Sequence, residues 1–168
     1  MARRCDWHHA VCTGDIDFDP KPWLNPLNTD LRAFIVEDSP VIRENLVAAL
    51  EELLPLKVLA TAEDESSAIA WLSDPDNDCE LGIIDIFLKR GTGLNVLKAI
   101  RAANQQIKLV VLSNFATPDM RRKCLELGAD KVFDKSNEID ALLVYCGRLA
   151  RGGSGDSGDS QGASLGAH

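Results

Sequence analysis

Two spacings of apolar residues alternate along the middle of the chain and predict five pairs of strand and helix. Short apolar runs are expected to form strands at 31–36, 57–61, 81–84, 107–112 and 131–133, and apolar residues at helical spacing follow each run, at 42–53, 65–72, 94–102, 119–127 and 139–149. The strand runs are continuously apolar, so the sheet should be covered on both faces. The pattern therefore predicts an α/β fold, a doubly wound parallel sheet with right-handed crossovers.

Residues at the expected helix ends agree with these boundaries. Ser39-Pro40 and Thr117-Pro118 each place a side-chain acceptor before a proline, as is typical of a helix N-terminus. Gly128 stands where a left-handed residue would end a helix. These signals support helices that begin near residues 40 and 118.

The two ends of the chain follow neither spacing. We expect a disordered leader at 1–30, one domain at 31–150, and a flexible tail at 151–168 that is rich in Gly, Ser and Asp. Within the leader, the C-x-x-H-H-x-x-C spacing from Cys5 to Cys12 could hold a soft metal, and the alternative is an unstructured segment.

Charge and composition narrow the class of protein. A net charge of -8 and a pI near 4.8 argue against direct binding to nucleic acid or to an anionic membrane. The sequence has no apolar run of membrane-spanning length and no apolar signal core after Met1, so a cytoplasmic location is expected. The five cysteines are odd in number and contain no CxxC, which favours reduced thiols.

Polar residues follow four of the five expected strands. They are Glu37 and Asp38 after the first strand, Asp85 after the third, Ser113 after the fourth and Lys135 after the fifth. The carboxyl ends of parallel strands lie at one edge of a sheet, which is where open α/β proteins bind ligands. Each residue alone could be an ordinary turn, cap or surface charge, but together they predict a site.

In this order, the motifs resemble those of the response-regulator receiver family over residues 31–150. The matching segments are Val36-Glu37-Asp38-Ser39-Pro40, Ile83-Ile84-Asp85 with Gly93, Val111-Leu112-Ser113-Asn114, and Gly128-Ala129-Asp130 followed by Phe133-Asp134-Lys135-Ser136. The resemblance implies a flavodoxin-like (βα)5 sheet with strand order 2-1-3-4-5. It also implies that Asp85 is a phosphoacceptor.

The resemblance implies a magnesium site beside Asp85. Mg²⁺ would be bound by Asp38, Asp85 and the backbone carbonyl of Phe87, with Glu37 acting mainly through a water molecule. A carboxylate attacks a charged phosphoryl group poorly until that charge is neutralised, and Mg²⁺ prefers oxygen ligands. The expected cofactor is therefore Mg²⁺.

The family's switch supplies the remaining roles. Lys135 is expected to pair with Asp85 before phosphorylation and to contact the phosphoryl group afterwards, while Ser113 donates its hydroxyl to that group. The surface formed by 119–127, 131–133 and 139–149 would then change. The chain would be a single-domain response regulator and not an enzyme with a separate substrate. Its partners would be a sensor histidine kinase or histidine phosphotransfer protein and a downstream protein, with homodimerisation as a further option.

Several positions depart from the family pattern near the site. Lys89 replaces a common proline, which predicts a more mobile and more basic loop at 86–92. Val132 replaces an aromatic residue, so a ring-flip readout is not expected, and Phe133 should point to the opposite side of the strand, into the core. Asn114 is bulkier than the usual small residue and is expected to slow small phosphodonors.

Two large apolar residues, Phe87 and Phe115, occupy positions that flank the attacking water in the family. We expect them to shield an acyl phosphate from water and to lengthen its lifetime. A phosphatase of the haloacid-dehalogenase type would need an aspartate at Phe87, and a nucleotide-binding reading of Gly91-Thr92-Gly93 lacks the third glycine, at Val96. A receiver fold that binds partners without phosphorylation stays open as the alternative.

Overall fold

A computed structural model describes residues 30–103 and 106–152 and contains all ten expected elements. In chain order they are β1 (Leu31–Val36), α2 (Pro40–Leu53), β2 (Leu56–Ala62), α3 (Glu65–Leu72), β3 (Leu81–Ile84), α4 (Gly93–Ala103), β4 (Lys108–Ser113), α5 (Pro118–Glu126), β5 (Lys131–Asp134) and α6 (Ile139–Ala150). The expectations for the leader and for its Cys5 to Cys12 spacing concern residues outside the described ranges, as does most of the tail.

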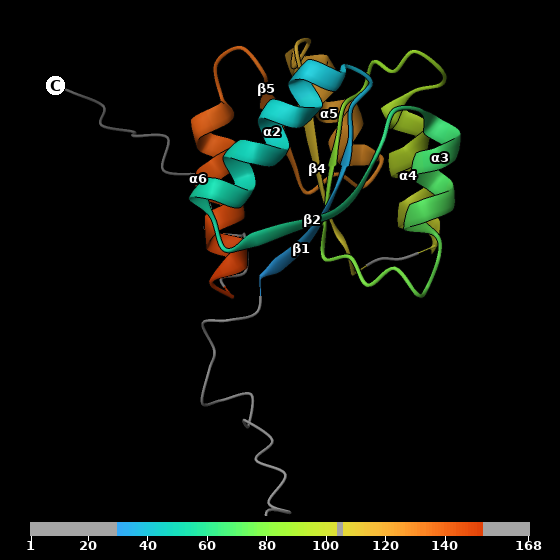
Figure 1. Cartoon of the computed structure of the whole chain (residues 1–168). Coiled ribbons are helices and arrows are strands. Elements are labelled where there is room, and N and C mark those ends of the chain that lie inside the picture. The colour runs from blue at the N-terminus through green and yellow to red at the C-terminus, as the bar shows by residue number, and fades with distance from the viewer. Residues whose placement is uncertain (1–29, 104–105, 153–168) are drawn as a thin grey trace, which may run out of the picture.

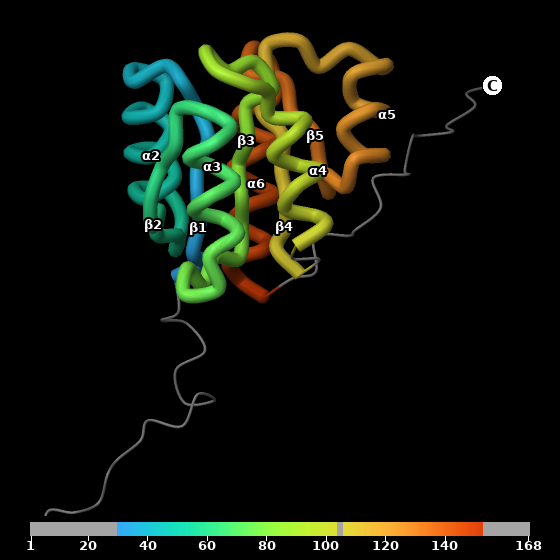
Figure 2. The backbone as a smooth tube through the Cα atoms, turned by 90° about the vertical axis from the view of Figure 1, so that its right-hand side faces the viewer, coloured from blue at the N-terminus to red at the C-terminus, as the bar shows by residue number. Residues whose placement is uncertain are grey.

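The five strands form one parallel sheet in the order β2-β1-β3-β4-β5, which confirms the expected topology. Helices α2 and α6 cover one face, and α3, α4 and α5 cover the other (Figures 1 and 2). Alternate residues of β1 enter different cores: Ala33 and Ile35 pack with α2 and α6, while Phe34 and Val36 pack on the opposite side. Burial on both faces explains why the strand runs are continuously apolar.

The edge strand β2 departs from this continuous burial. Its ends, Leu56 and Ala62, are buried, but Leu59 is 41% exposed and Lys57 and Thr61 are exposed. An edge strand has a neighbour on one side only, so part of its surface faces solvent. The four strands that carry the candidate site residues are β1, β3, β4 and β5, and the apolar residues of β1, β3 and β4 are all buried.

Side-chain caps begin three of the helices. Ser39 Oγ accepts a hydrogen bond from the backbone N–H of Ile42 (3.5 Å), and Thr117 Oγ1 accepts one from the N–H of Met120 (3.3 Å). Gly128 follows α5 with φ +107, and a Cβ there would lie 2.7 Å from Cγ of Arg101. These contacts confirm the expected boundaries. At position 128 glycine is favoured, because other residues rarely adopt this backbone conformation and their Cβ would collide with Arg101.

The three cysteines in the described ranges, Cys79, Cys124 and Cys146, are unpaired, as expected for reduced thiols. Burial raises the pKa of Cys146 to about 12, so this thiol is a core residue and not a reactive group. No helix within residues 30–103 and 106–152 is long and apolar enough to cross a membrane.

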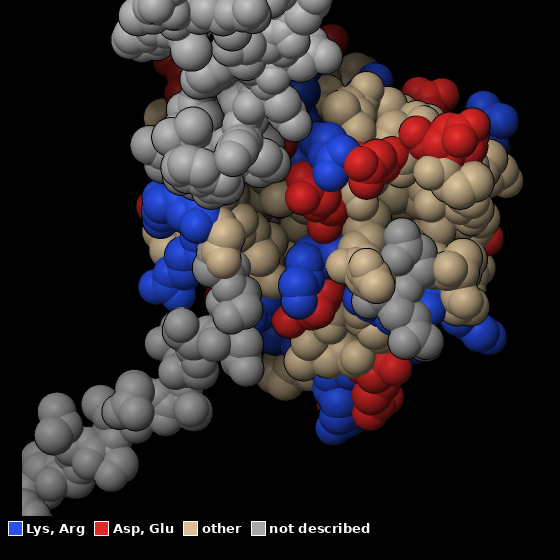
Figure 3. Space-filling model, turned by 90° about the horizontal axis from the view of Figure 1, so that it is seen from below, with Lys and Arg blue, Asp and Glu red and all other residues tan. Residues whose placement is uncertain are grey.

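The amino ends and the carboxyl ends of the strands lie at opposite edges of the sheet, and different kinds of residue gather at each. The amino ends of the strands lie at the bottom of Figure 1, and the view from below shows basic and acidic side chains interspersed on that face (Figure 3). Near the amino end of β1, Arg32 forms ion pairs with Asp78 and with Glu80. The expected site residues lie at the opposite edge, where the strands end.

Candidate functional site

The carboxyl edge of the sheet contains the buried polar groups of the described chain. Apart from cysteine and tyrosine, the polar or charged residues buried within 30–103 and 106–152 are Glu37 (2% exposed), Asp85 (8%) and Ser113 (0%). Glu37 directly follows β1, Asp85 directly follows β3, and Ser113 is the last residue of β4. Burying a polar group is costly without partners, so this concentration marks the edge as a built site.

Three carboxylates converge there from two strand ends. Glu37, Asp38 and Asp85 each offer an oxygen atom, and these atoms lie within 4.8 Å of one another. The backbone N–H of Asp85 donates to the carbonyl of Val36 (2.9 Å), and the N–H of Phe87 donates to Asp85 Oδ1 (3.3 Å), which position the aspartate. A cluster of hard oxygen donors suits a divalent cation such as Mg²⁺.

Lys135 partly balances this negative charge. Its Nζ atom lies 2.7 Å from Asp85 Oδ2 and also donates to Glu37, and its side chain is 8% exposed. The expected pairing of Lys135 with Asp85 is confirmed. The direct ion pair with Glu37 is new, because sequence reasoning had assigned Glu37 a role through water.

Burial and the shared hydrogen bonds shift the pKa values of Lys135 and Glu37. Burial lowers the pKa of Lys135, but the hydrogen bonds to Asp85 and Glu37 outweigh it and raise the pKa above the ordinary value. Burial raises the pKa of Glu37, and the hydrogen bond with Lys135 only partly offsets this. Lys135 therefore stays charged between its two carboxylate partners.

Ser113 lies at the boundary between the core and the site. Its Oγ atom accepts a hydrogen bond from the N–H of Phe115 (3.3 Å), and its carbonyl accepts one from the N–H of Lys135 (3.1 Å). Strand pairing places Ser113 beside Asp134, the neighbour of Lys135. The fold therefore brings Ser113 and Lys135 to adjacent strand ends, as the sequence predicted.

A cavity of about 170 Å³ opens over this cluster. Its lining residues are Glu37, Asp38, Ser39, Ile42, Asp85, Phe87, Asn114, Phe115 and Lys135. All of the expected metal ligands and Lys135 are among them, with Phe87 and Asn114 at the same opening. The cavity is lined by both carboxylates and aromatic rings, and its volume is large enough for a phosphoryl group and a metal ion.

Phe87 and Phe115 pack against each other beside the cavity. Their ring centroids are 5.1 Å apart and their planes meet at 71°, an edge-to-face contact. They remain 51% and 61% exposed. The sequence shows two large apolar residues at these positions, and the tertiary structure adds that they contact each other.

The loop after Asp85 is held by a residue that sequence reasoning missed. The carboxylate of Glu65, at the start of α3, accepts a hydrogen bond from the N–H of Thr92 (2.8 Å), and the N–H of Glu65 donates to the carbonyl of Arg90 (3.1 Å). Gly91 has φ +80, and a Cβ there would lie 2.3 Å from Glu65. These contacts restrain the loop in which Lys89 replaces the usual proline. No sequence signal singled out Glu65, because its partner Thr92 lies 27 residues away.

The two residues near the end of β5 behave as expected. Phe133 is 9% exposed and lies in the core with α6, where its ring centroid is 5.9 Å from that of Tyr145. Val132 packs on the opposite face of the sheet. The prediction that Phe133 is a core residue is confirmed.

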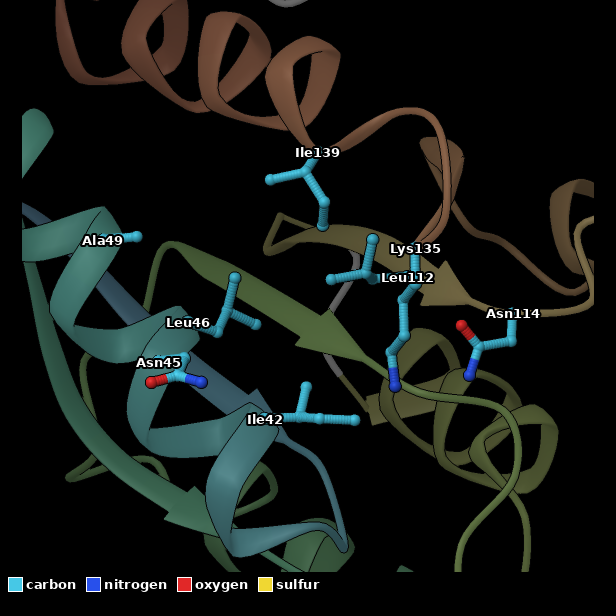
Figure 4. Close-up of a pocket in the computed structure, with 8 residues that line it drawn as sticks. All are labelled: Ile42, Asn45, Leu46, Ala49, Leu112, Asn114, Lys135 and Ile139. Carbon is cyan, nitrogen blue, oxygen red and sulfur yellow. The ribbon is translucent and has the colours of Figure 1, made fainter.

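An apolar groove runs beside the site between α2 and α6. Figure 4 shows Ile42 and Leu46 of α2 and Ile139 of α6 pointing into it, with Lys135 and Asn114 at one end. Its volume is about 430 Å³. Ile42, Asn114 and Lys135 line both the groove and the cavity over Asp85, so the two adjoin each other.

Comparison with known proteins agrees with this geometry. Residues 33–146 match the response regulator receiver domain family, and the chain belongs to this family. It is 32% identical over 130 residues to a probable transcriptional regulatory protein of Picosynechococcus sp., a match that covers 74% of this chain and 51% of that protein. It is 31% identical over 123 residues to the transcriptional regulatory protein CusR of Escherichia coli, covering 73% of this chain and 52% of CusR. The chain thus spans about half the length of these curated relatives.

Solved structures show the same fold. The response regulator domain of Thermotoga maritima CheB has a TM-score of 0.64 and 19% identity, covering 74% of this chain and 98% of that one. The isolated receiver domain of RcsB from Salmonella enterica, solved with phosphomimetic BeF3-, has a TM-score of 0.65 and 22% identity, covering 74% of this chain and 91% of that one. The flavodoxin-like receiver fold expected from the sequence is confirmed.

Proposed function

We propose that this chain is a phosphoacceptor switch of a two-component system, in which Asp85 accepts a phosphoryl group from a phosphohistidine. The observation that carries the proposal is the cluster of three carboxylates within 4.8 Å of one another, of which Glu37 and Asp85 are buried and Asp38 is half-buried, with the ammonium group of Lys135 at 2.7 Å from Asp85. An isolated structural salt bridge would not need two further carboxylates beside it. A site that binds Mg²⁺ and a phosphoryl group needs both the carboxylates and the lysine.

In the proposed reaction, a carboxylate oxygen of Asp85 attacks phosphorus and the bond from phosphorus to the donor's imidazole nitrogen breaks, leaving an acyl phosphate. Mg²⁺, held by Asp38, Asp85 and the carbonyl of Phe87 with Glu37 acting through a water molecule, would neutralise charge on the phosphoryl oxygens. Lys135 would exchange its contact with Asp85 for one with a phosphoryl oxygen. The ion pair in the present structure supports this role, because it already places the ammonium group beside the reacting carboxylate.

Ser113 would donate its hydroxyl to the new phosphoryl group and thereby move the loop between β4 and α5. The consequence would be a changed surface formed by α5, β5 and α6, which the downstream protein would recognise. Val132 has no ring to report the change, so the output would depend on the position of the backbone and of α5. The chain would assist its own phosphorylation and dephosphorylation and would not act on a separate substrate.

The proposed donor is a sensor histidine kinase or a histidine phosphotransfer protein. The groove between α2 and α6 supports a protein donor, because it is apolar and opens onto the cavity over Asp85. The exposed rings of Phe87 and Phe115 add apolar surface at the same opening. We also propose that two copies of the chain can dimerise through the surface of α5, β5 and α6. Direct binding to nucleic acid is not proposed.

The test is intact-mass spectrometry after incubation with phosphoramidate and Mg²⁺. One added phosphoryl mass is expected for the wild type, and none for Asp85→Asn or in EDTA. Asp119→Asn is the control, because its side chain is 87% exposed on α5 and should leave labelling unchanged. If the wild type also remains unlabelled with a phosphorylated histidine kinase as donor, the chain is instead a receiver fold that binds partners without phosphorylation.

A further inference from the structure

One guanidinium group connects the two loops that follow β4 and β5. Arg121 of α5 donates from Nε to the carbonyl of Ala116 (2.9 Å), from Nη1 to the carbonyl of Val132 (2.8 Å) and from Nη2 to Oε2 of Glu138 (2.6 Å). The planar fork of arginine can make these three contacts at once, whereas lysine could not reproduce their geometry. Arg121 therefore joins three segments: the loop before α5, strand β5 and the start of α6.

Glu138 completes the connection. Its Oε2 atom also accepts a hydrogen bond from the N–H of Asp134 (2.6 Å), and its own N–H donates to the carbonyl of Asp134 (2.8 Å). The hydrogen bond from Arg121 lowers the pKa of Glu138, which keeps this carboxylate ionised. The side chains of Arg121 and Glu138 are 33% and 36% exposed, so the pair is shielded only in part.

These contacts lie next to both of the residues that would touch the phosphoryl group. Ala116 comes three residues after Ser113, and Asp134 comes directly before Lys135. In the present arrangement Ser113 Oγ accepts from the N–H of Phe115 at 3.3 Å, and Phe115 is 61% exposed. A movement of this loop toward Asp85 would have to stretch the contact between Arg121 and Ala116 or carry the start of α5 with it.

We propose that Arg121 and Glu138 form a latch that holds the loop between β4 and α5 in its unphosphorylated arrangement, and that phosphorylation of Asp85 opens this latch. The inference rests on the proposed function. Interactions made in only one of two arrangements bias the equilibrium toward that arrangement, so removing them favours the other. The latch also gives the chain a backbone-based link between the site and α5, in place of a ring at Val132.

The test compares Arg121→Gln and Glu138→Gln with Arg122→Gln. Arg122 is the matched control, because it lies on the same helix and pairs with Asp119 on an exposed surface, where the side chains are 70% and 87% exposed. Hydrogen exchange without a phosphodonor should be faster at the amides of Phe115 and Ala116 in the two latch variants. With phosphoramidate and Mg²⁺, both variants should be phosphorylated at an initial rate about fivefold above that of the wild type. A factor of about five is the lower end of the usual coupling between two sites.

The double variant Arg121→Gln with Glu138→Gln should resemble Arg121→Gln, because both changes break the same ion pair between Arg121 and Glu138. Should a Gln variant fail to fold by circular dichroism, Arg121→Lys, which keeps the charge and loses the fork, is expected to show a smaller effect in the same direction. Latch variants that match the wild type in exchange and phosphorylation, or that fold normally and phosphorylate less, would overturn the latch. A wild type that takes no phosphoryl group overturns the proposed function, and the latch falls with it.

Discussion

The Nζ atom of Lys135 lies 2.7 Å from Oδ2 of Asp85, although the two residues are 50 positions apart in the chain. The same ammonium group pairs with Glu37, and all three side chains are less than 10% exposed. Removing one member of such a buried cluster leaves an uncompensated charge, which destabilises the fold. The cluster is therefore both a structural element and a candidate reaction centre, and its two roles can be separated by experiment.

Lys135→Met should destabilise the protein in EDTA by about 3 kcal/mol, because it leaves Glu37 and Asp85 buried without their cation. Added Mg²⁺ should restore part of this loss by binding the carboxylates in place of the ammonium group. Urea denaturation with and without Mg²⁺ measures both effects. Lys123→Met, at an exposed position on α5, is the control for the loss in EDTA, and a Lys135→Met protein that Mg²⁺ does not stabilise would contradict the predicted metal site.

Gly93→Ala should displace the backbone of Asp85. A Cβ on Gly93 would lie 2.1 Å from the carbonyl oxygen and 2.8 Å from the carbonyl carbon of Asp85, so the backbone of the phosphoacceptor would have to move. We expect a loss of about 2 kcal/mol in stability and a slower phosphorylation of the folded fraction. Thermal unfolding and intact-mass labelling measure these. Ser66→Ala, at an exposed helical position, should change neither, and a Gly93→Ala protein with normal labelling would show that the backbone adapts.

Phe87→Asn and Phe115→Glu should each shorten the lifetime of the phosphorylated state. Each change opens the edge-to-face pair, whose centroids are 5.1 Å apart, and lets water reach the acyl phosphate. A tenfold shorter half-life would correspond to a barrier lowered by about 1.4 kcal/mol. Loss of the added phosphoryl mass over time gives the half-life. Val144→Asn, at a 53% exposed position on α6, is the control, and a half-life of seconds in the wild type that neither change alters would refute the shielding role.

Ala49→Glu should separate a protein donor from a small one. Ala49 lines the groove between α2 and α6 but not the cavity over Asp85, so a glutamate there would obstruct a docked protein without touching the reacting groups. Transfer from a phosphorylated histidine kinase should fall about tenfold, equivalent to about 1.4 kcal/mol of binding, while labelling by phosphoramidate should not change. Ala48→Glu is exposed on the same helix and serves as the control. Equal transfer rates in both variants would place the donor elsewhere.

The contact between Arg121 and Glu138 should make stability depend on acidity. The hydrogen bond from Arg121 holds the pKa of Glu138 below its ordinary value of 4.5, so its contribution to stability is present above that value and is lost as the pH falls through the lowered pKa. The difference in stability between the wild type and Glu138→Gln should therefore be largest near neutral pH and shrink in acid. Urea denaturation at several pH values measures it, and a difference that does not vary with pH would mean that Glu138 acts without its charge.

Local signals were sufficient to predict the framework of this fold. The apolar runs and the caps at Ser39 and Thr117 depend on neighbouring residues only, so they could be recognised in the sequence. The structure places the elements within a few residues of the expected bounds. The strand order came from the resemblance to the receiver family. The one qualification is β2, an edge strand in which exposed and partly buried residues alternate between its buried ends.

What the sequence determined by itself is the set of groups at the strand ends: Glu37, Asp38, Asp85, Ser113 and Lys135. Their convergence follows from parallel strands, whose carboxyl ends must share one edge. Only the tertiary structure decided how neighbouring groups pair across the chain. Those contacts are the ion pair from Lys135 to Glu37, the packing of Phe87 on Phe115, the hold of Glu65 on the loop at Thr92, and the link from Arg121 to Glu138. Each joins residues that lie 17 to 98 positions apart or in different loops, and no local pattern specifies which long-range partner will be within reach once the helices pack.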